Sequence, residues 1–239
     1  DYVDKESGPT NQKVPSYAHA VGAVYRNSDP TDIAVTAAGG LVGEVVQIWR
    51  PRELNTHETE WGFSCMSYEI SGALGIKMAN PDKEVITFIG DGSYLLYNSD
   101  IYSSVLSGHK MIVDVCDNGG FAVINRLQTG MGVPGFNNLL KDARIKNKDN
   151  PPHVDFAKHA EAMGALAKHC ESLSDLENAM EWAQTTDRTT VISINSDAYS
   201  WTPGGADWYV GVPEINDRQS IREAREGQEA FRKKQRQGI

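Results

Sequence analysis

Two apolar, β-branched runs in this sequence end in the same way, and this feature constrains the fold more than any other. Residues 85–89 (VITFI) are followed by Gly-Asp-Gly, and residues 111–116 (MIVDVC) are followed by Asp-Asn-Gly-Gly. Asp91 and Asn118 are 27 positions apart (118 − 91), about the length of a strand, a crossover helix and a second parallel strand. Because parallel strands end at the same edge of a sheet, we expect the two side chains to lie close together.

The rest of the chain also alternates between strand-like and helix-like segments. Further strand-like runs lie at residues 33–38, 165–169 and 191–195, and their continuous apolar character is typical of parallel strands buried on both faces. The intervening segments predict helices at residues 14–26, 43–49, 66–79, 94–107, 155–164 and 174–185. This order predicts an α/β fold, a doubly wound, mostly parallel sheet with helices on both faces.

Two Ser-x-x-Glu patterns predict helix starts. One begins at Ser174, before the last strand, and the other begins at Ser220 and opens a polar C-terminal helix. Residues 129–152 are instead rich in Gly, Asn, Lys and Pro and show little periodicity. A connection of this length predicts a lid, a binding loop or a disordered segment.

Composition limits the class of protein. The 239 residues, 40% hydrophobic and 23% charged, suit one large globular domain. A net charge of −9 argues against nucleic-acid binding, and no run of 18 apolar residues predicts a membrane span. Three cysteines without a close pair favour a reducing cytoplasm over a disulfide framework or structural zinc. The sequence begins Asp-Tyr-Val rather than with methionine, and we expect a piece of a longer chain.

The residues at the two strand ends suit a metal-bridged phosphate. Gly90 and Gly92 flank Asp91 and let a ligand approach the backbone closely, and Gly119–Gly120 follow Asn118. A carboxylate, an amide oxygen and a backbone carbonyl form the kind of oxygen site that Mg²⁺ shares with phosphate groups. Either dipeptide alone is more often only a turn. The two together, after matching strands at this interval, favour a site.

These two motifs at this interval resemble the signature of thiamine diphosphate enzymes, in which they form the Mg²⁺-diphosphate site. The resemblance implies that Asp91, the side chain of Asn118 and the backbone oxygen of Gly120 are metal ligands. The family usually has two asparagines at the second motif, and here the first of them is Asp117. This departure leaves the ligand position itself intact.

Two further segments match the family in order. Residues 36–43 (TAAGGLVG) fall at its first diphosphate-contacting strand end, and residues 62–69 (GFSCMSYE) fall at the loop that grips the aminopyrimidine. Met66 matches the bulky residue that wedges the cofactor into a bent form. The resemblance thus implies cofactor contacts from Gly39, Gly40, Leu41, Ser64, Met66, Gly90, Asp91, Gly92, Ser93, Asn118, Gly120 and Phe121.

The segments CMSYEISGALGIKMA, GGFAVINRLQ and ADWYVGVPEIND resemble one subfamily, the trihydroxycyclohexane-1,2-dione hydrolases of inositol catabolism. Acetolactate synthase-like members continue after the methionine with Gly-aromatic-Gly-Leu-Pro, whereas this chain has Ser67–Tyr68–Glu69–Ile70. The resemblance implies hydrolysis of a C–C bond in a cyclic 1,2-dione, giving 5-deoxyglucuronate, with thiamine diphosphate and Mg²⁺ as cofactors. An acetolactate synthase-like or decarboxylase-type reaction is the alternative.

The resemblance covers only the C-terminal, diphosphate-binding third of such an enzyme. It implies that residues 1–239 form a single thiamine diphosphate- and Mg-binding domain in which residues 200–239 are a C-terminal extension. An N-terminal pyrimidine-binding domain would supply the activating glutamate, so the fragment alone is expected to be inactive. The resemblance also implies at least a homodimer, because the cofactor would lie between domains of partner subunits.

The sequence leaves open the role of His57 and two alternative functions. His57 titrates near neutrality and could move protons at the substrate, or it could be a solvated loop residue. Residues 38–43 nearly give a nicotinamide-binding fingerprint, but residues 51–61, where a second strand would be needed, predict no strand. A third reading is a non-catalytic partner subunit that binds the diphosphate only to hold an assembly together.

Overall fold

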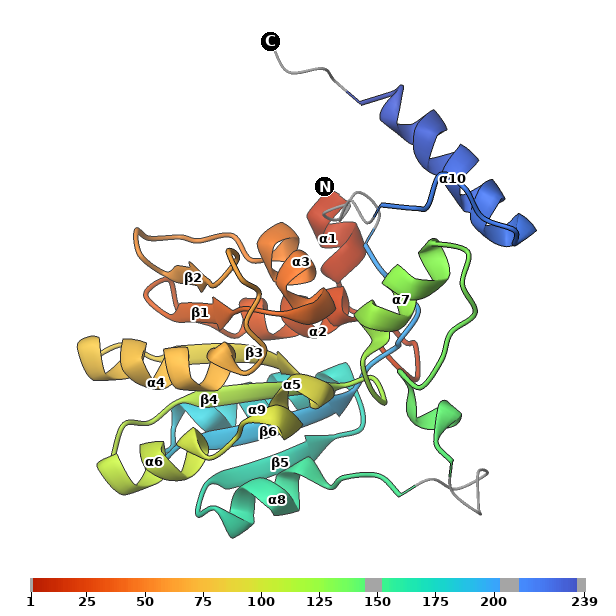
Figure 1. Ribbon diagram of the computed structural model, residues 1–239. Helices are drawn as coiled ribbons and strands as arrows, with labels where there is room; N and C mark the ends of the chain where they lie inside the picture. The colour runs from red at the N-terminus through yellow and green to blue at the C-terminus, as the bar shows by residue number, and fades with distance from the viewer. Residues whose placement is uncertain (1, 145–151, 203–210, 236–239) are drawn as a thin grey trace.

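The computed structural model describes residues 2–144, 152–202 and 211–235. They form a six-stranded, all-parallel sheet with helices on both faces (Figure 1), in the order β2-β1-β3-β4-β6-β5. The strands are β1 (Ile33–Thr36), β2 (His57–Thr59), β3 (Val85–Gly90), β4 (Ile112–Asp117), β5 (Leu166–Cys170) and β6 (Thr190–Asn195). The predicted doubly wound α/β fold is confirmed.

The helices cover the sheet in two layers, because successive strand residues point to opposite faces. On one face, Ala34, Phe88 and Ile112 join a buried cluster with residues of α2 (Tyr17–Arg26), α3 (Gly39–Ile48) and α9 (Leu173–Gln184). On the other face, Val35 and Val113 pack with residues of α4 (Tyr68–Ala79), α6 (Asp100–Ser107) and α8 (Phe156–Ala162). The sheet is therefore buried on both sides, as its apolar strands predict.

The register of the two central strands sets the place of the polar residues that follow them. β3 and β4 are buried along their length except at their last residues, Gly90 and Asp117, which are half-buried. Gly90 pairs with Cys116 across the two strands. The Gly-Asp-Gly and Asp-Asn-Gly-Gly turns thus leave the sheet side by side at its carboxyl edge.

The prediction that residues 51–61 contain no strand is wrong. β2 lies within them and pairs with β1, with Ala34 opposite His57. The chain reaches this edge through backbone hydrogen bonds, including Ala34 N–H to the Thr56 oxygen at 3.1 Å and Glu60 N–H to the Thr36 oxygen at 3.2 Å. A three-residue edge strand can pair through its backbone alone, so it leaves little apolar signal in the sequence.

Several helix boundaries differ from the prediction. The helix predicted at residues 94–107 is two helices, α5 (Asp91–Leu96) and α6, because Tyr97 is extended at φ −156° and ψ 110°. The two predicted helix starts are wrong. α9 begins after Ser172, whose hydroxyl accepts a hydrogen bond from the Asp175 N–H at 3.1 Å. The C-terminal helix α10 (Gln219–Arg232) begins after Arg218, and the Ser220 hydroxyl donates instead to the Gly132 oxygen at 2.7 Å.

The remaining elements lie around the carboxyl edge and the N-terminus. α7 (Ala122–Gly130), which the sequence did not predict, follows β4, and a 3₁₀ turn spans Leu140–Asp142. Within the long connection predicted at residues 129–152, residues 145–151 lie outside the described part of the chain. α1 (Tyr2–Ser7) precedes α2, and α10 projects beyond the sheet in Figure 1. No helix in the described ranges is long and apolar enough to cross a membrane.

Candidate functional site

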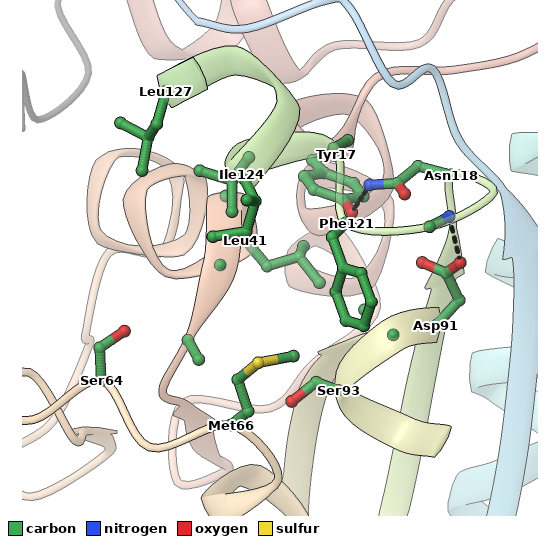
Figure 2. A pocket seen from close by; sticks show the side chains of 18 residues that line it. Tyr17, Leu41, Ser64, Met66, Asp91, Ser93, Asn118, Phe121, Ile124 and Leu127 are labelled. Carbon is green, nitrogen blue, oxygen red and sulfur yellow. Dashed lines mark hydrogen bonds between the residues drawn. The ribbon is translucent and has the colours of Figure 1, made fainter. Parts of the chain in front are cut away.

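A cavity of about 170 Å³ lies at the carboxyl edge of β1, β3 and β4 (Figure 2). Every residue for which the sequence predicted a cofactor contact lines it, although these residues come from separate turns and loops. They are Gly39, Gly40 and Leu41 at the start of α3, Ser64 and Met66 before α4, Gly90, Asp91, Gly92 and Ser93 after β3, and Asn118, Gly120 and Phe121 after β4.

Two buried oxygens at one end of the cavity have no protein partner. One carboxylate oxygen of Asp91 accepts a hydrogen bond from the Gly120 N–H at 2.6 Å, and the Asn118 amide donates to the Tyr17 hydroxyl (Figure 2). The remaining oxygens, Asp91 Oδ1 and Asn118 Oδ1, are buried and make no hydrogen bond within the described residues. Buried polar atoms are nearly always satisfied, so this pair fits a ligand that accepts lone pairs.

The donor set at this end suits a hard cation. Among the described residues, no cluster of three His, Cys, Asp or Glu side chains could hold a metal. A cation here would therefore rest on one carboxylate, one amide oxygen and a backbone carbonyl, completed by oxygens of a ligand, which is how Mg²⁺ usually binds beside phosphate. The open oxygens of Asp91 and Asn118 suit this donor set, and the assignment of Asp91, Asn118 and Gly120 as Mg²⁺ ligands stays a prediction.

The charge state of Asp91 depends on what lies beside it. Burial and, less strongly, the nearby Asp117 together raise the pKa of its carboxyl to about 7, against the opposing effect of the Gly120 N–H. A cation in the cavity would favour the ionised form. Asp117 itself accepts a hydrogen bond from the Gly119 N–H at 2.9 Å. The acid that replaces the family's first asparagine thus closes the turn.

Two glycines bring the backbone close to other groups at this end. Gly120 has φ +138°, and a Cβ there would lie 2.4 Å from the Asn138 oxygen. A Cβ on Gly92 would lie 2.6 Å from the Phe121 ring. Side chains at either position would displace the turn or the ring that line the cavity.

The loop that carries Met66 has an unusual backbone. Ser64 and Ser67, on either side of Met66, have φ +50° and +74°, in the left-handed region that non-glycine residues seldom adopt. Glu60 fixes the loop, because its carboxylate accepts hydrogen bonds from the N–H groups of Phe63 at 2.8 Å and Cys65 at 2.6 Å. These bonds lower the pKa of Glu60. Figure 2 shows the Met66 side chain pointing into the cavity.

Comparison with known protein families decides what kind of site this is. The family described as "Thiamine pyrophosphate enzyme, C-terminal TPP binding domain" matches residues 37–194, which include all the predicted cofactor contacts. The chain belongs to this thiamine pyrophosphate enzyme family. Thiamine pyrophosphate is the same compound as thiamine diphosphate, so the cofactor implied by the sequence motifs is that of the family. A nicotinamide-binding reading of residues 38–43 is thereby superseded.

Several curated relatives of this chain share a name. The chain is 32% identical over 249 residues to the 3D-(3,5/4)-trihydroxycyclohexane-1,2-dione hydrolase of Geobacillus thermodenitrificans, covering 98% of this chain and 38% of that protein. It is 36% identical over 209 residues to the protein of the same name from Halalkalibacterium halodurans, covering 87% of this chain and 32% of that protein. The chain therefore spans about a third of the length of the curated relatives it matches.

Solved structures show the same fold. The thiamine diphosphate-dependent 4-hydroxybenzoylformate decarboxylase of Rhodococcus jostii superposes with a TM-score of 0.69 at 17% identity, over 79% of this chain and 34% of that chain. Benzoylformate decarboxylase from Polynucleobacter necessarius superposes with a TM-score of 0.65 at 20% identity, over 76% and 33%. At these identities the likeness concerns the fold of this thiamine pyrophosphate-binding domain.

The structure adds cavity residues that the sequence analysis missed. Tyr17 enters from α2, where it is buried and hydrogen-bonded to Asn118. One wall is apolar and comes from α7, through Ala122, Val123, Ile124 and Leu127. The apolar positions 123, 124 and 127 have helical spacing, which could have indicated α7. No local signal links Tyr17 to a turn 101 positions away.

His57 is the one predicted functional residue that does not line the cavity. It lies in the edge strand β2, and its Nε2 is 2.9 Å from the Thr59 hydroxyl. Burial lowers the pKa of its imidazole, so the ring is mainly neutral at pH 7. A proton-transfer role at the substrate stays a prediction.

Proposed function

We propose that the protein carrying this chain uses thiamine diphosphate and Mg²⁺ to hydrolyse a C–C bond in a cyclic 1,2-dione, a trihydroxycyclohexane-1,2-dione, in inositol degradation. The observation that carries the proposal is the pair of unpartnered oxygens of Asp91 and Asn118 at the cavity of a thiamine pyrophosphate-binding domain. The substrate is inferred from the shared name of the curated relatives. It would yield the open-chain acid 5-deoxyglucuronate.

Different residues at the carboxyl edge would bind the metal and the diphosphate. Asp91 Oδ1, Asn118 Oδ1 and the Gly120 carbonyl would hold Mg²⁺, and the turn at Gly39–Leu41 with Ser93 would contact the diphosphate. When bound, the cofactor supplies a carbanion that adds to a carbonyl and then accepts electrons from the bond that breaks. The protein's share is to fix that group against the substrate and to exclude competing reactions.

The loop before α4 would set the shape of the cofactor. Met66 points into the cavity (Figure 2), and Glu60 fixes the backbone of its loop. We propose that the Met66 side chain would hold the bound cofactor in a bent form. The Ser64 carbonyl and the Met66 N–H would meet the pyrimidine ring. Replacing Met66 with glycine is expected to lower turnover more than cofactor affinity, and equal losses would contradict this role.

The remaining parts of the proposal concern the whole enzyme. Residues 1–239 would form one cofactor-binding domain, with residues 200–239 as an extension. Because the curated relatives are about three times as long as the matched region, an N-terminal domain would supply the pyrimidine pocket and its activating glutamate. The active form would be a homodimer or larger, and the present fragment alone would be inactive.

The test is an assay of the natural full-length protein. Its hydrolysis of the cyclic dione is measured with Mg²⁺, after EDTA, and after Mg²⁺ is restored, beside decarboxylation and carboligation of a 2-oxo acid. We expect metal-dependent hydrolysis to be the fastest of the three. Faster decarboxylation or carboligation would contradict the proposed reaction. Cofactor binding without turnover of any substrate would support the partner-subunit reading.

A further inference from the structure

Glu69 is a fully buried acid next to the cofactor cavity, and the proposed chemistry gives it no role. It lies in the first turn of α4, three positions after Met66, and its exposed fraction is 0%. It does not line the cavity. A carboxyl group taken out of water costs free energy unless hydrogen bonds compensate it. Burial accordingly raises the pKa of Glu69.

The hydrogen bonds of Glu69 reach two other segments of the site. One carboxylate oxygen accepts the Ala38 N–H at 3.1 Å, and the other accepts the Ser93 hydroxyl at 3.3 Å. Ala38 precedes α3, Ser93 lies in α5, and both line the cavity. The backbone oxygen of Glu69 also accepts the Thr87 hydroxyl of β3 at 2.9 Å. An interaction with the helix dipole alone would not need these bonds to other segments.

Ser93 in turn holds the strained residue beside Met66. The Ser67 N–H donates to the Ser93 hydroxyl oxygen at 2.7 Å, and the Ser67 hydroxyl donates to the Ser93 backbone oxygen at 2.5 Å. Ser67 has φ +74°, a conformation that persists only where the surroundings fix it. A series of hydrogen bonds therefore runs from Ala38 through the side chains of Glu69 and Ser93 to Ser67, and it connects three separate segments.

We propose that Glu69 is a positioning residue that joins these three segments into one unit before any cofactor binds. The segments are the turn before α3, the Met66 loop and the start of α5. The inference rests on the proposed function in so far as these segments hold thiamine diphosphate. By fixing Ser93 and the backbone at Ser67, Glu69 sets where Met66 stands relative to the diphosphate-binding turns.

The test compares Glu69 with a matched buried acid elsewhere. Glu44 of α3 is 3% exposed and also accepts one N–H and one hydroxyl, both from Thr202. It does not line the cavity. Amide hydrogen exchange at Ala38 and Ser67 is measured in the cofactor-free, natural full-length protein for the wild type, Glu69→Ala, Glu69→Gln, Glu44→Ala and Glu44→Gln. Thiamine diphosphate affinity with Mg²⁺ is measured for the same set.

We expect Glu69→Ala to speed exchange at both amides, and to weaken cofactor affinity, by about tenfold, the effect of one lost buried hydrogen bond. Glu69→Gln should fall between it and the wild type, because an amide keeps one of the two acceptor oxygens. If Glu69→Ala does not fold, the exchange rates of Glu69→Gln test the proposal. The Glu44 variants should leave both amides and the affinity within about twofold of the wild type.

Unchanged exchange at Ala38 and Ser67 in the Glu69 variants would overturn the proposal. Equal acceleration in the Glu44 variants would also overturn it, because the effect would then be a general loss of stability. The exchange measurement needs no cofactor. If the wild type binds no thiamine diphosphate, the proposed function fails while the exchange rates still decide the role of Glu69.

Discussion

Two buried aspartates, one directly after β3 and one within the neighbouring strand β4, differ in what surrounds them. Asp91 follows β3 at the cavity, where the Gly120 N–H bonds to one oxygen and the other faces no protein donor among the described residues. Asp114 lies in the middle of β4, and both of its oxygens are buried without a hydrogen bond from the described chain. Burial raises the pKa of Asp91 to about 7 and that of Asp114 to about 8.

A raised pKa alone therefore does not mark a functional acid in this protein. Asp114 belongs to the face that packs on α2 and α9, between Ile112 and Cys116, and it does not line the cavity at the carboxyl edge. Asp91 shares a cavity with a second open oxygen from the neighbouring strand end. Convergence of oxygens on one space distinguishes a candidate site from a buried charge that only costs stability.

The largest effect is expected at Asp91. Replacing Asp91 with alanine removes the only carboxylate proposed as a metal ligand. Loss of a residue that only orients a metal ligand costs about 10–100-fold in affinity, so for a direct ligand we expect a loss of at least about a hundredfold in Mg²⁺-dependent cofactor binding. Circular dichroism should show an intact fold. Unchanged affinity in a folded variant would mean that Asp91, like Asp114, is a buried acid without a role in binding.

The next effect concerns stability rather than binding. Asp114 has a pKa of about 8 in the folded protein and roughly 4 when unfolded. Between these values the folded state holds a proton that the unfolded state lacks, so the free energy of unfolding falls as pH rises from about 4 to 8. Asp114→Asn removes this dependence. It should stabilise the protein by about 2 kcal/mol near pH 8.5, because an unpaired buried amide offsets part of the gain.

Denaturant unfolding at pH 5, 6.5 and 8.5 checks the Asp114 prediction. Burial and, less strongly, Asp114 raise the pKa values of the nearby Cys116 and Cys170 thiols, and Cys116→Ala serves as the control for the Cys116 contribution. Cofactor affinity should be the same in Asp114→Asn as in the wild type. A loss of affinity there, or a fall in stability with pH as steep as that of the wild type, would contradict the separate roles of the two aspartates.

The smallest effect is expected at Tyr17. Its hydroxyl accepts the Asn118 amide N–H, and this bond leaves the amide oxygen as the atom without a partner. Tyr17→Phe keeps the ring against Trp201 but lets the amide rotate. We expect Mg²⁺-dependent cofactor affinity to fall about tenfold, as for other partners that orient a metal ligand. Titration of the cofactor at two Mg²⁺ concentrations measures this affinity. If Tyr17→Phe leaves the affinity unchanged, Tyr17 does not orient Asn118.

The sequence could indicate the central part of this fold because its signals are local. β3 and β4 are apolar, β-branched runs that stop at glycine and acidic or amide residues, so their type, order and polar ends follow from short stretches. The twelve cofactor contacts that the family resemblance implies lie in short segments after β1, β3 and β4 and before α4, and the structure brings them to one cavity. The edge strand β2 has no such signal, because its pairing depends on the free edge of β1.

Long-range contacts explain what the sequence could not indicate. Tyr17 reaches Asn118 across 101 positions, and Glu69 becomes buried because Ala38 and Ser93 approach it from other segments. Within its own segment, Glu69 is only an acid in the first turn of a helix. The helix starts predicted at Ser174 and Ser220 are wrong for two different reasons, one local and one long-range. Ser172 caps α9 two residues earlier, and Ser220 bonds to Gly132 of a distant loop.

The measurement that tests the central claim most directly is calorimetric titration of thiamine diphosphate into the natural full-length protein, first with Mg²⁺ and then with EDTA. The account predicts binding with Mg²⁺, its loss with EDTA, and its return when Mg²⁺ is restored, because the open oxygens of Asp91 and Asn118 reach the diphosphate only through a cation. Binding that is unaffected by EDTA, or no binding under either condition, would contradict a metal-bridged site at this edge of the sheet.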